Sequence, residues 1–194
     1  MTTLANRPSG GVTAPKPPAV PMATVPQMPE TTAQKYARYV FAGVRIAIGW
    51  TFVWAFLDKM FGFGISTPDK NAWINGGHPT AGFLGKSATG PFADLWNGAA
   101  GTWWADSLFM IGLLGIGVAL MLGIGMRIAA AAGTLLYVLM WSVVLHPTTN
   151  PFIDDHLIQA GVLVGLALIG AGATFGLGKW WAGTPLVRKL PWLK

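Results

Sequence analysis

The chain has 194 residues, of which 53% are hydrophobic and only 10% are charged. An average soluble domain has about 25% charged residues, so the composition argues against a soluble globular protein. Cysteine is absent, which excludes disulfides, thiolate metal sites, covalently attached c-type haem and a cysteine nucleophile. The net charge of +6 does not require nucleic acid as a partner, because basic residues also mark the cytoplasmic side of membrane proteins.

The first 34 residues predict a tail and not a domain. Residues 1–30 contain seven of the fourteen prolines and no apolar periodicity. Proline removes a backbone donor and favours the extended polyproline II conformation. A signal peptide is not indicated either, because a continuous apolar stretch is missing.

Four apolar segments follow this tail, each near the roughly 20 residues that a helix needs to cross a bilayer. The expected spans cover about 36–61, 106–124, 128–145 and 153–175. The sequence therefore predicts an all-α membrane protein with a four-transmembrane-helix bundle over residues 35–178. A basic cytoplasmic tail is expected over 179–194.

About forty residues rich in Gly, Asn, Pro and Trp join the first two spans. They are too interrupted for a spanning helix and are typical of short interfacial helices and turns. If these four segments cross a membrane, six of the seven acidic residues lie on the same side as this loop. Ten of the thirteen basic residues lie on or toward the other side. The positive-inside rule then predicts a bacterial plasma-membrane protein with both termini in the cytoplasm and a long extracytoplasmic loop.

Ionisable residues gather near the ends of three spans. Asp58 ends the first span, where the last carbonyls of a helix disfavour a carboxylate, so it needs a partner. His146 is the best candidate, either as a structural pair or as part of a ligand site. Asp154, Asp155 and His156 fit a helix start, but they also fit a convergent ionisable group that could exchange protons.

A metal site is not indicated, because no Glu-x-x-His or His-x3-His pair lies on one helix. A haem held by His146 and His156 is a minor alternative. Arg45 lies inside the first span, and we expect it to snorkel toward the cytoplasm or to pair with a partner's carboxylate or a lipid phosphate. Motifs of soluble enzymes, such as a phosphate loop or a serine elbow, are absent.

Tryptophans form a second candidate feature. Trp50 and Trp54 are one turn apart on the first span, and Trp141 lies at a similar depth on the third. An aromatic wall beside polar groups could hold a flat ring such as a quinone head group. A position in the aromatic belt at the membrane interface, or packing in the core of the bundle, would also explain these three tryptophans.

Several segments in order carry a family resemblance: WTFVWAFLDKMFG, WINGGHPTAGFLG, GPFADLW, LFMIGLLGIGVALMLGIGMRIAA and NPFIDDHLIQAGVLVGLALIGAG. Together they resemble the DoxX/DoxD-like family of small bacterial membrane proteins, over about residues 37–194. That family is similar to the membrane subunit of thiosulfate:quinone oxidoreductase. The resemblance implies a four-helix bundle and quinone chemistry.

The leading functional hypothesis is a quinone-linked redox component that works with partner subunits. Quinone is expected against Trp50, Trp54 and Trp141, while Asp58, His146 and His156 exchange protons. The alternative is a non-catalytic accessory subunit of a larger respiratory or other energy-converting membrane complex. A small transporter is less favoured, because no span is broken or charged at its midplane.

Overall fold

A computed structural model describes residues 29–148 and 150–194, so most of the predicted Pro-rich tail over 1–34 lies outside the described residues. The chain divides into the units Met1–Glu30 and Thr31–Lys194. The described residues of the second unit form helices and turns with no strand among them. An all-α fold is therefore confirmed for this part of the chain.

The first helix, α1, spans Thr32–Phe61 and is about 45 Å long at 1.5 Å per residue. Its start is fixed by a capping box, in which the Thr31 side chain accepts from the Gln34 backbone and the Gln34 side chain accepts from the Thr31 backbone. Helix α1 therefore begins inside the segment that we expected to be tail. Its other end is closed by Gly62, which adopts φ 68°.

Helices α4 (Trp103–Leu122) and α5 (Met126–Val143) form a tight hairpin. Gly123 and Gly125 both have positive φ, 70° and 56°, so the chain reverses between the two helices within a few residues. Together with α1, these helices are long and apolar enough to cross a membrane. Three of the four predicted spans thus have helices of the required kind.

The fourth predicted span differs from the structure in length. Helix α6 covers Asp155–Leu168, which at 14 residues is about 21 Å long and shorter than a bilayer core of about 30 Å. It ends before Phe175 because Gly170 adopts φ 66°, a left-handed conformation that stops the helix. A single 3₁₀ turn, Ala171–Ala173, follows.

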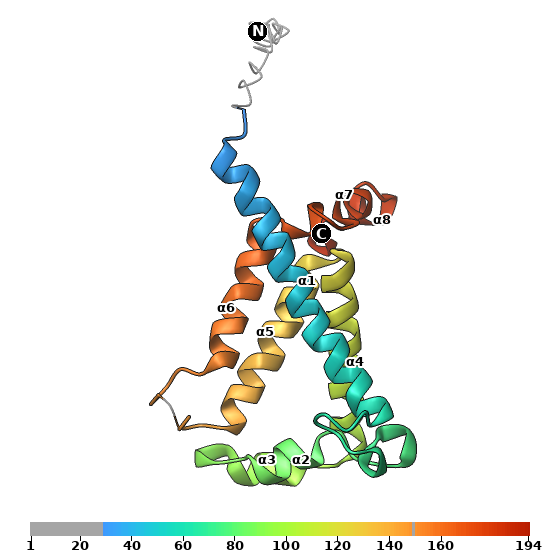
Figure 1. The fold of residues 1–194 in the computed structure, drawn as a ribbon, viewed down its shortest axis with the longest axis vertical. Coiled ribbons are helices and arrows are strands. Elements are labelled where there is room, and N and C mark those ends of the chain that lie inside the picture. Colours follow the sequence, from blue (N-terminus) through green and yellow to red (C-terminus); the bar gives the residue numbers. More distant parts are fainter. Residues whose placement is uncertain (1–28, 149) are drawn as a thin grey trace, which may run out of the picture. The chain divides into compact units, whose positions relative to one another are not determined.

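The long helices pack as two pairs, α1 on α4 and α5 on α6, which join where α4 meets α5 (Figure 1). Close approach depends on glycine: a Cβ on Gly49 would lie 2.9 Å from the Met121 nitrogen, and one on Gly117 would lie 2.8 Å from Val53 Cγ2. Three other glycines face open space, because a Cβ on any of them would meet nothing within 4 Å in the described chain: Gly115, Gly161 and Gly165.

Short elements cover the two ends of the bundle (Figure 1). Helices α2 (Ala81–Lys86) and α3 (Ala93–Ala99) lie at the end that also holds the C-terminus of α1, and we call this the acidic end. Helices α7 (Gly178–Ala182) and α8 (Pro185–Lys189) lie at the opposite, basic end. The basic end is tied to the α4–α5 turn by hydrogen bonds from Leu177 N to the Leu122 carbonyl (2.8 Å) and from Arg127 N to the Lys194 carbonyl (2.9 Å).

Candidate ligand site at the acidic end

Asp58 is fully buried near the C-terminus of α1 and takes its partner from the loop that follows. Its Oδ2 accepts hydrogen bonds from the Ser66 hydroxyl (2.5 Å) and from the Ser66 backbone N–H (3.3 Å). The expected partner His146 is not bonded to it, so that expectation is wrong. The reason is local: the chain reverses at Gly62 and brings Ser66 back over the end of the helix. Oδ1 of Asp58 is buried without a donor.

His146 lies beyond the end of α5 and is exposed. No hydrogen bond or ion pair of its ring occurs within the described ranges. His156, in contrast, is held by Asp154: its Nδ1 lies 2.6 Å from Asp154 Oδ2. Because an ionised carboxylate only accepts, we assign the hydrogen to Nδ1, which leaves Nε2 as an acceptor. The three residues expected to exchange protons therefore do not form one group by direct contact.

Asp154 also explains why α6 begins where it does. Its Oδ1 accepts from the Leu157 N–H at 3.2 Å, so the residue caps the helix while its other oxygen orients His156. Asn150 does not cap this helix. The Asn150 oxygen instead accepts from the backbone N–H groups of Phe152 and Ile153 and forms the turn before the helix.

The His156 ring lies between aromatic neighbours from two other helices. Its centroid is 6.4 Å from that of Phe83 on α2 and 6.1 Å from that of Tyr137 on α5. The Tyr137 hydroxyl donates to Gln159 Oε1 at 2.5 Å. These contacts fix the segment that contains α2 beside the start of α6.

A second carboxylate–histidine pair joins Asp106, one of the acidic residues expected near this end of the bundle, to His78, which the sequence did not single out. Asp106, in the first turn of α4, is almost fully buried, and its Oδ2 lies 2.9 Å from His78 Nδ1. Its Oδ1 accepts from both the N–H (2.9 Å) and the hydroxyl (2.6 Å) of Thr80. The Thr80 oxygen accepts in turn from the Gly101 N–H at 3.0 Å. This cluster ties the loop to the start of α4.

The available sequence signal for this cluster was a histidine in a Gly-Gly-His-Pro-Thr segment followed by an aspartate at a helix start. Nothing in the sequence says that the two meet, because 28 positions separate them. With His78 included, all three histidines of the chain lie at the acidic end. Among the described residues, no group of three or more His, Asp or Glu side chains is placed as a metal site would need.

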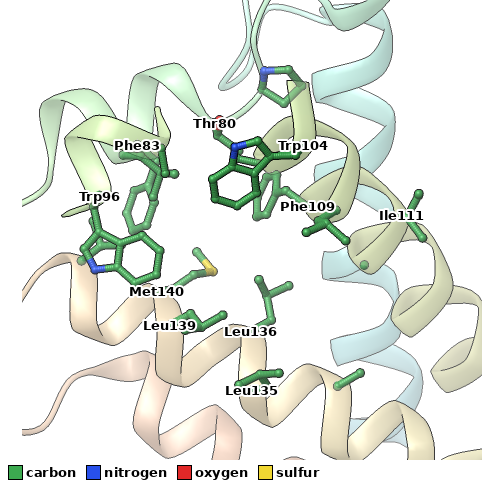
Figure 2. Close-up of a pocket in the computed structure, with 18 of the residues that line it drawn as sticks. Thr80, Phe83, Trp96, Trp104, Phe109, Ile111, Leu135, Leu136, Leu139 and Met140 are labelled. Atoms are coloured by element: carbon green, nitrogen blue, oxygen red, sulfur yellow. The ribbon is translucent and has the colours of Figure 1, made fainter. Parts of the chain in front are cut away.

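An apolar cavity of about 480 Å³ lies beside this cluster, between the loop helices and the α4–α5 hairpin. Figure 2 shows Phe83 and Trp96 on one side, with Trp104 and Phe109 of α4 opposite them and Leu135, Leu136, Leu139 and Met140 of α5 along another wall. Leu108, Ile111 and Leu135 are each about 60–70% exposed, so the cavity is open to the surroundings of the bundle and not sealed. Thr80 belongs both to its lining and to the Asp106 cluster.

The tryptophans predicted to hold a ring lie elsewhere. Trp50 and Trp54 pack on each other with centroids 6.0 Å apart, and Trp54 stacks on Phe63. Trp141 donates its indole N–H to the Phe152 carbonyl at 2.7 Å. None of the three lines the cavity. Trp96 and Trp104, which the prediction did not choose, do line it.

Arg45 is completely buried and has a different role from the one expected. Its guanidinium donates to four carbonyls, those of Leu120 (2.8 Å), Met121 (3.4 Å), Thr174 (3.3 Å) and Phe175 (2.9 Å). The last carbonyls of a helix lack some of the intrahelical donors, and Arg45 supplies donors to two carbonyls at the end of α4 and to two in the segment after α6. Snorkelling to the surface is therefore wrong for this side chain.

The fold and the site define a helical protein whose three longest helices suit a membrane. Comparisons with protein-family models, with curated proteins and with solved structures find no match. Assignment to a particular family therefore stays a prediction from the sequence segments themselves.

Proposed function

We propose that this chain is a multi-pass protein of the bacterial plasma membrane that binds a quinone and acts as a quinone-linked component with partner subunits. The observation that carries the proposal is the apolar cavity beside the buried Asp106–His78–Thr80 cluster. The DoxX/DoxD-like resemblance, which also implies quinone chemistry, points the same way.

In this proposal α1, α4, α5 and the segment from α6 to Phe175 make four crossings. Beyond the helical part of the fourth crossing, which ends at Leu168, Arg45 supplies donors to the carbonyls of Thr174 and Phe175, as backbone inside a membrane requires. Six acidic residues at one end and most of the basic residues at the other support this orientation: the basic end faces the cytoplasm and the α2–α3 loop faces outward.

The cavity suits the two parts of a quinone. Apolar side chains from α4 and α5 would hold an isoprenoid tail. Burial of that tail is favourable by about 25 cal/mol per Å² of apolar surface removed from water. Aromatic rings of Phe83, Trp96 and Trp104 would flank the head group by stacking. A quinone supplies two-electron, two-proton chemistry when bound.

The residues of the chain supply hydrogen bonding near that head group. Thr80 lines the cavity, and its hydroxyl is oriented by Asp106. The Asp154–His156 pair packs against Phe83, which is also part of the lining. Both histidines are held through Nδ1, so their Nε2 atoms are left to accept or exchange a proton.

The test is labelling with an azido-quinone in membranes, followed by mass spectrometry of the labelled peptides. We expect label on peptides that contain Trp96, Trp104 or Leu136. Gly112→Leu would place a side chain into the cavity, since Gly112 lines it and a Cβ there would meet Leu136 at 4.0 Å. The matched control is Gly115→Leu on the same helix, which faces open space away from the lining.

Loss of labelling in Gly112→Leu with labelling kept in Gly115→Leu supports the cavity as the site. Equal labelling of both variants contradicts it. Label confined to peptides with Trp50 or Trp54 would instead place the quinone site at the tryptophans that the sequence indicated.

A second candidate function, an accessory subunit of a larger membrane complex, is favoured by one specific observation. Gly161 and Gly165 form a Gly-x-x-x-Gly pattern on α6, and a Cβ at either position would meet nothing within 4 Å. Small residues of this kind let transmembrane helices of different subunits approach closely. Gentle extraction and native mass measurement would separate the two: co-purifying cofactor-bearing subunits without bound quinone favour the accessory role.

A further inference from the structure

The last seventeen residues, Gly178–Lys194, form an ordered cap on the basic end. Trp181 donates its indole N–H to the Leu193 carbonyl at 2.7 Å, and Val187 is completely buried. Arg127, from the start of α5, donates its backbone N–H to the Lys194 carbonyl (2.9 Å) and its guanidinium to the Pro191 carbonyl (3.3 Å). The cap is therefore fastened to the bundle by both backbone and side-chain contacts.

The outer surface of this cap combines apolar and basic side chains. Trp180 and Trp192 are 65% and 58% exposed, and Leu186 is 52% exposed. The cationic side chains Lys179, Arg188, Lys189 and Lys194 are also exposed. No ion pair to any of them occurs in the described part of the chain, and the sequence contains no acidic residue after Asp155.

We propose that the cap Gly178–Lys194 is a binding surface for the head groups of anionic phospholipids. Exposed tryptophan and leucine suit the interfacial layer of a bilayer, where an amphipathic ring contacts both apolar chains and water. Lysine and arginine are attracted to the negative surface potential of an anionic leaflet. Because the cap is already ordered by the contacts of Trp181, Val187 and Arg127, little chain entropy is lost on binding.

This inference rests on the proposed crossing of the bilayer and not on quinone binding. The cap continues directly from the basic end of the bundle, where the bilayer surface would lie, and this places lipid phosphates at the level of the four cations. A free phosphate would meet the same charges but would gain nothing from Trp180 or Trp192. Lipid is therefore the occupant that uses both features of the surface.

The experiment is native mass spectrometry of the detergent-solubilised full chain with phosphatidylglycerol or phosphatidylcholine. We expect phosphatidylglycerol adducts to be retained preferentially. A variant that changes Lys179, Arg188, Lys189 and Lys194 to Gln should lose that preference by about tenfold or more. The matched control changes Lys59, Lys70 and Lys86 at the acidic end to Gln and should keep it. Thermal unfolding of both variants checks that the fold is retained.

A second measurement does not depend on the charge variants. The chain has no cysteine, so Ala182→Cys carries a single fluorophore on the cap. In bilayers, this label should report a more apolar environment when phosphatidylglycerol replaces part of the phosphatidylcholine. The proposal would be overturned by fluorescence spectra that are the same with and without phosphatidylglycerol, or by equal amounts of adduct with the two lipids. An equal loss of preference in the acidic-end control variant would also overturn it. Displacement of the lipid by excess inorganic phosphate would do the same. A chain that inserts in bilayers but shows no anionic preference refutes the lipid surface alone and leaves the membrane proposal intact.

Discussion

The Nη2 atom of Arg45 lies 2.9 Å from the carbonyl oxygen of Phe175, 130 positions further along the chain. The same guanidinium reaches the Leu120 carbonyl through Nη1 at 2.8 Å. One buried side chain thus joins α1 to the end of α4 and to the segment after α6. Within the described residues, all the hydrogen bonds of this buried guanidinium go to backbone carbonyls, so Arg45 links these three parts of the structure.

Replacing Arg45 by Met should lower the free energy of unfolding by about 2–4 kcal/mol, because four carbonyls lose a charged donor. Arg45→Lys should recover only part of the lost stability. A lysine ammonium lacks the planar, two-pronged guanidinium that reaches both pairs of carbonyls. Thermal unfolding in detergent is the measurement. Lys35→Met on the exposed start of α1 is the control and should stay within about 0.5 kcal/mol of the native protein. Equal stability of Arg45→Met and Lys35→Met would contradict the fastening role.

Two glycines on α4 offer a matched pair that tests the packing of α1 on α4. Gly117→Ala would place a Cβ 2.8 Å from Val53 Cγ2 and 2.9 Å from the Val53 nitrogen, so the helices must separate, at a cost of about 1–3 kcal/mol. Gly115→Ala faces open space and should stabilise the helix slightly, by up to about 1 kcal/mol. Opposite changes in melting temperature are expected. A gain in stability for Gly117→Ala would show that the two helices are further apart than described.

Asp106→Ala should loosen the loop between α1 and α4. The substitution leaves the buried N–H and hydroxyl of Thr80 without their acceptor and frees His78, at a cost of about 2–4 kcal/mol. Faster hydrogen exchange and proteolysis should be confined to residues 76–102. Asp94→Ala, in the exposed first turn of α3, is the control and should leave the exchange pattern unchanged. If both variants behave alike, the cluster does not hold the loop.

The neighbouring acids of α6 should respond differently to substitution. Asp154→Ala removes both the helix cap and the partner of His156 and should cost about 1–2 kcal/mol. Asp155→Ala removes only an exposed charge near the helix start, worth about 0.3–1 kcal/mol. Nitrogen-15 NMR adds an independent readout: the hydrogen should sit on Nδ1 of His156 in the native protein and lose this preference only in Asp154→Ala. An unchanged tautomer in that variant would count against the pair.

Membrane orientation can be measured with single cysteines, since the chain has none of its own. Lys70→Cys, in the loop between α1 and α4, should react with an impermeant maleimide on intact cells. Lys189→Cys, in α8, should react only after the membrane is permeabilised. The opposite pattern would reverse the proposed orientation. Labelling of both positions on intact cells would contradict the three crossings that the proposal places between them.

The sequence determines the helices more closely than it determines the candidate site. Asp154 and His156 fit both a helix start and a convergent group of ionisable residues, and the structure joins them by a direct contact. Asp58 was chosen because a carboxylate is unfavourable at a helix C-terminus, but its partner is Ser66 and not His146. The cavity could not be anticipated, because Trp96 and Trp104 become neighbours only when the loop folds back over α4 and α5.

The sequence by itself determined the helices and the two ends of this protein. Runs of apolar residues, the cap at Thr31 and the glycine stops act over a few positions, so they can be read locally. The segregation of acidic and basic residues likewise follows once the helices are placed.

Only the tertiary structure decided where the polar groups find partners. Arg45 binds carbonyls 75 to 130 positions away, and Asp106 binds His78 across the loop. The same holds for the segment after Leu168, where Arg45 donates to the carbonyls of Thr174 and Phe175. Contacts of this kind depend on how whole helices pack, and that packing cannot be predicted from the local pattern of residues.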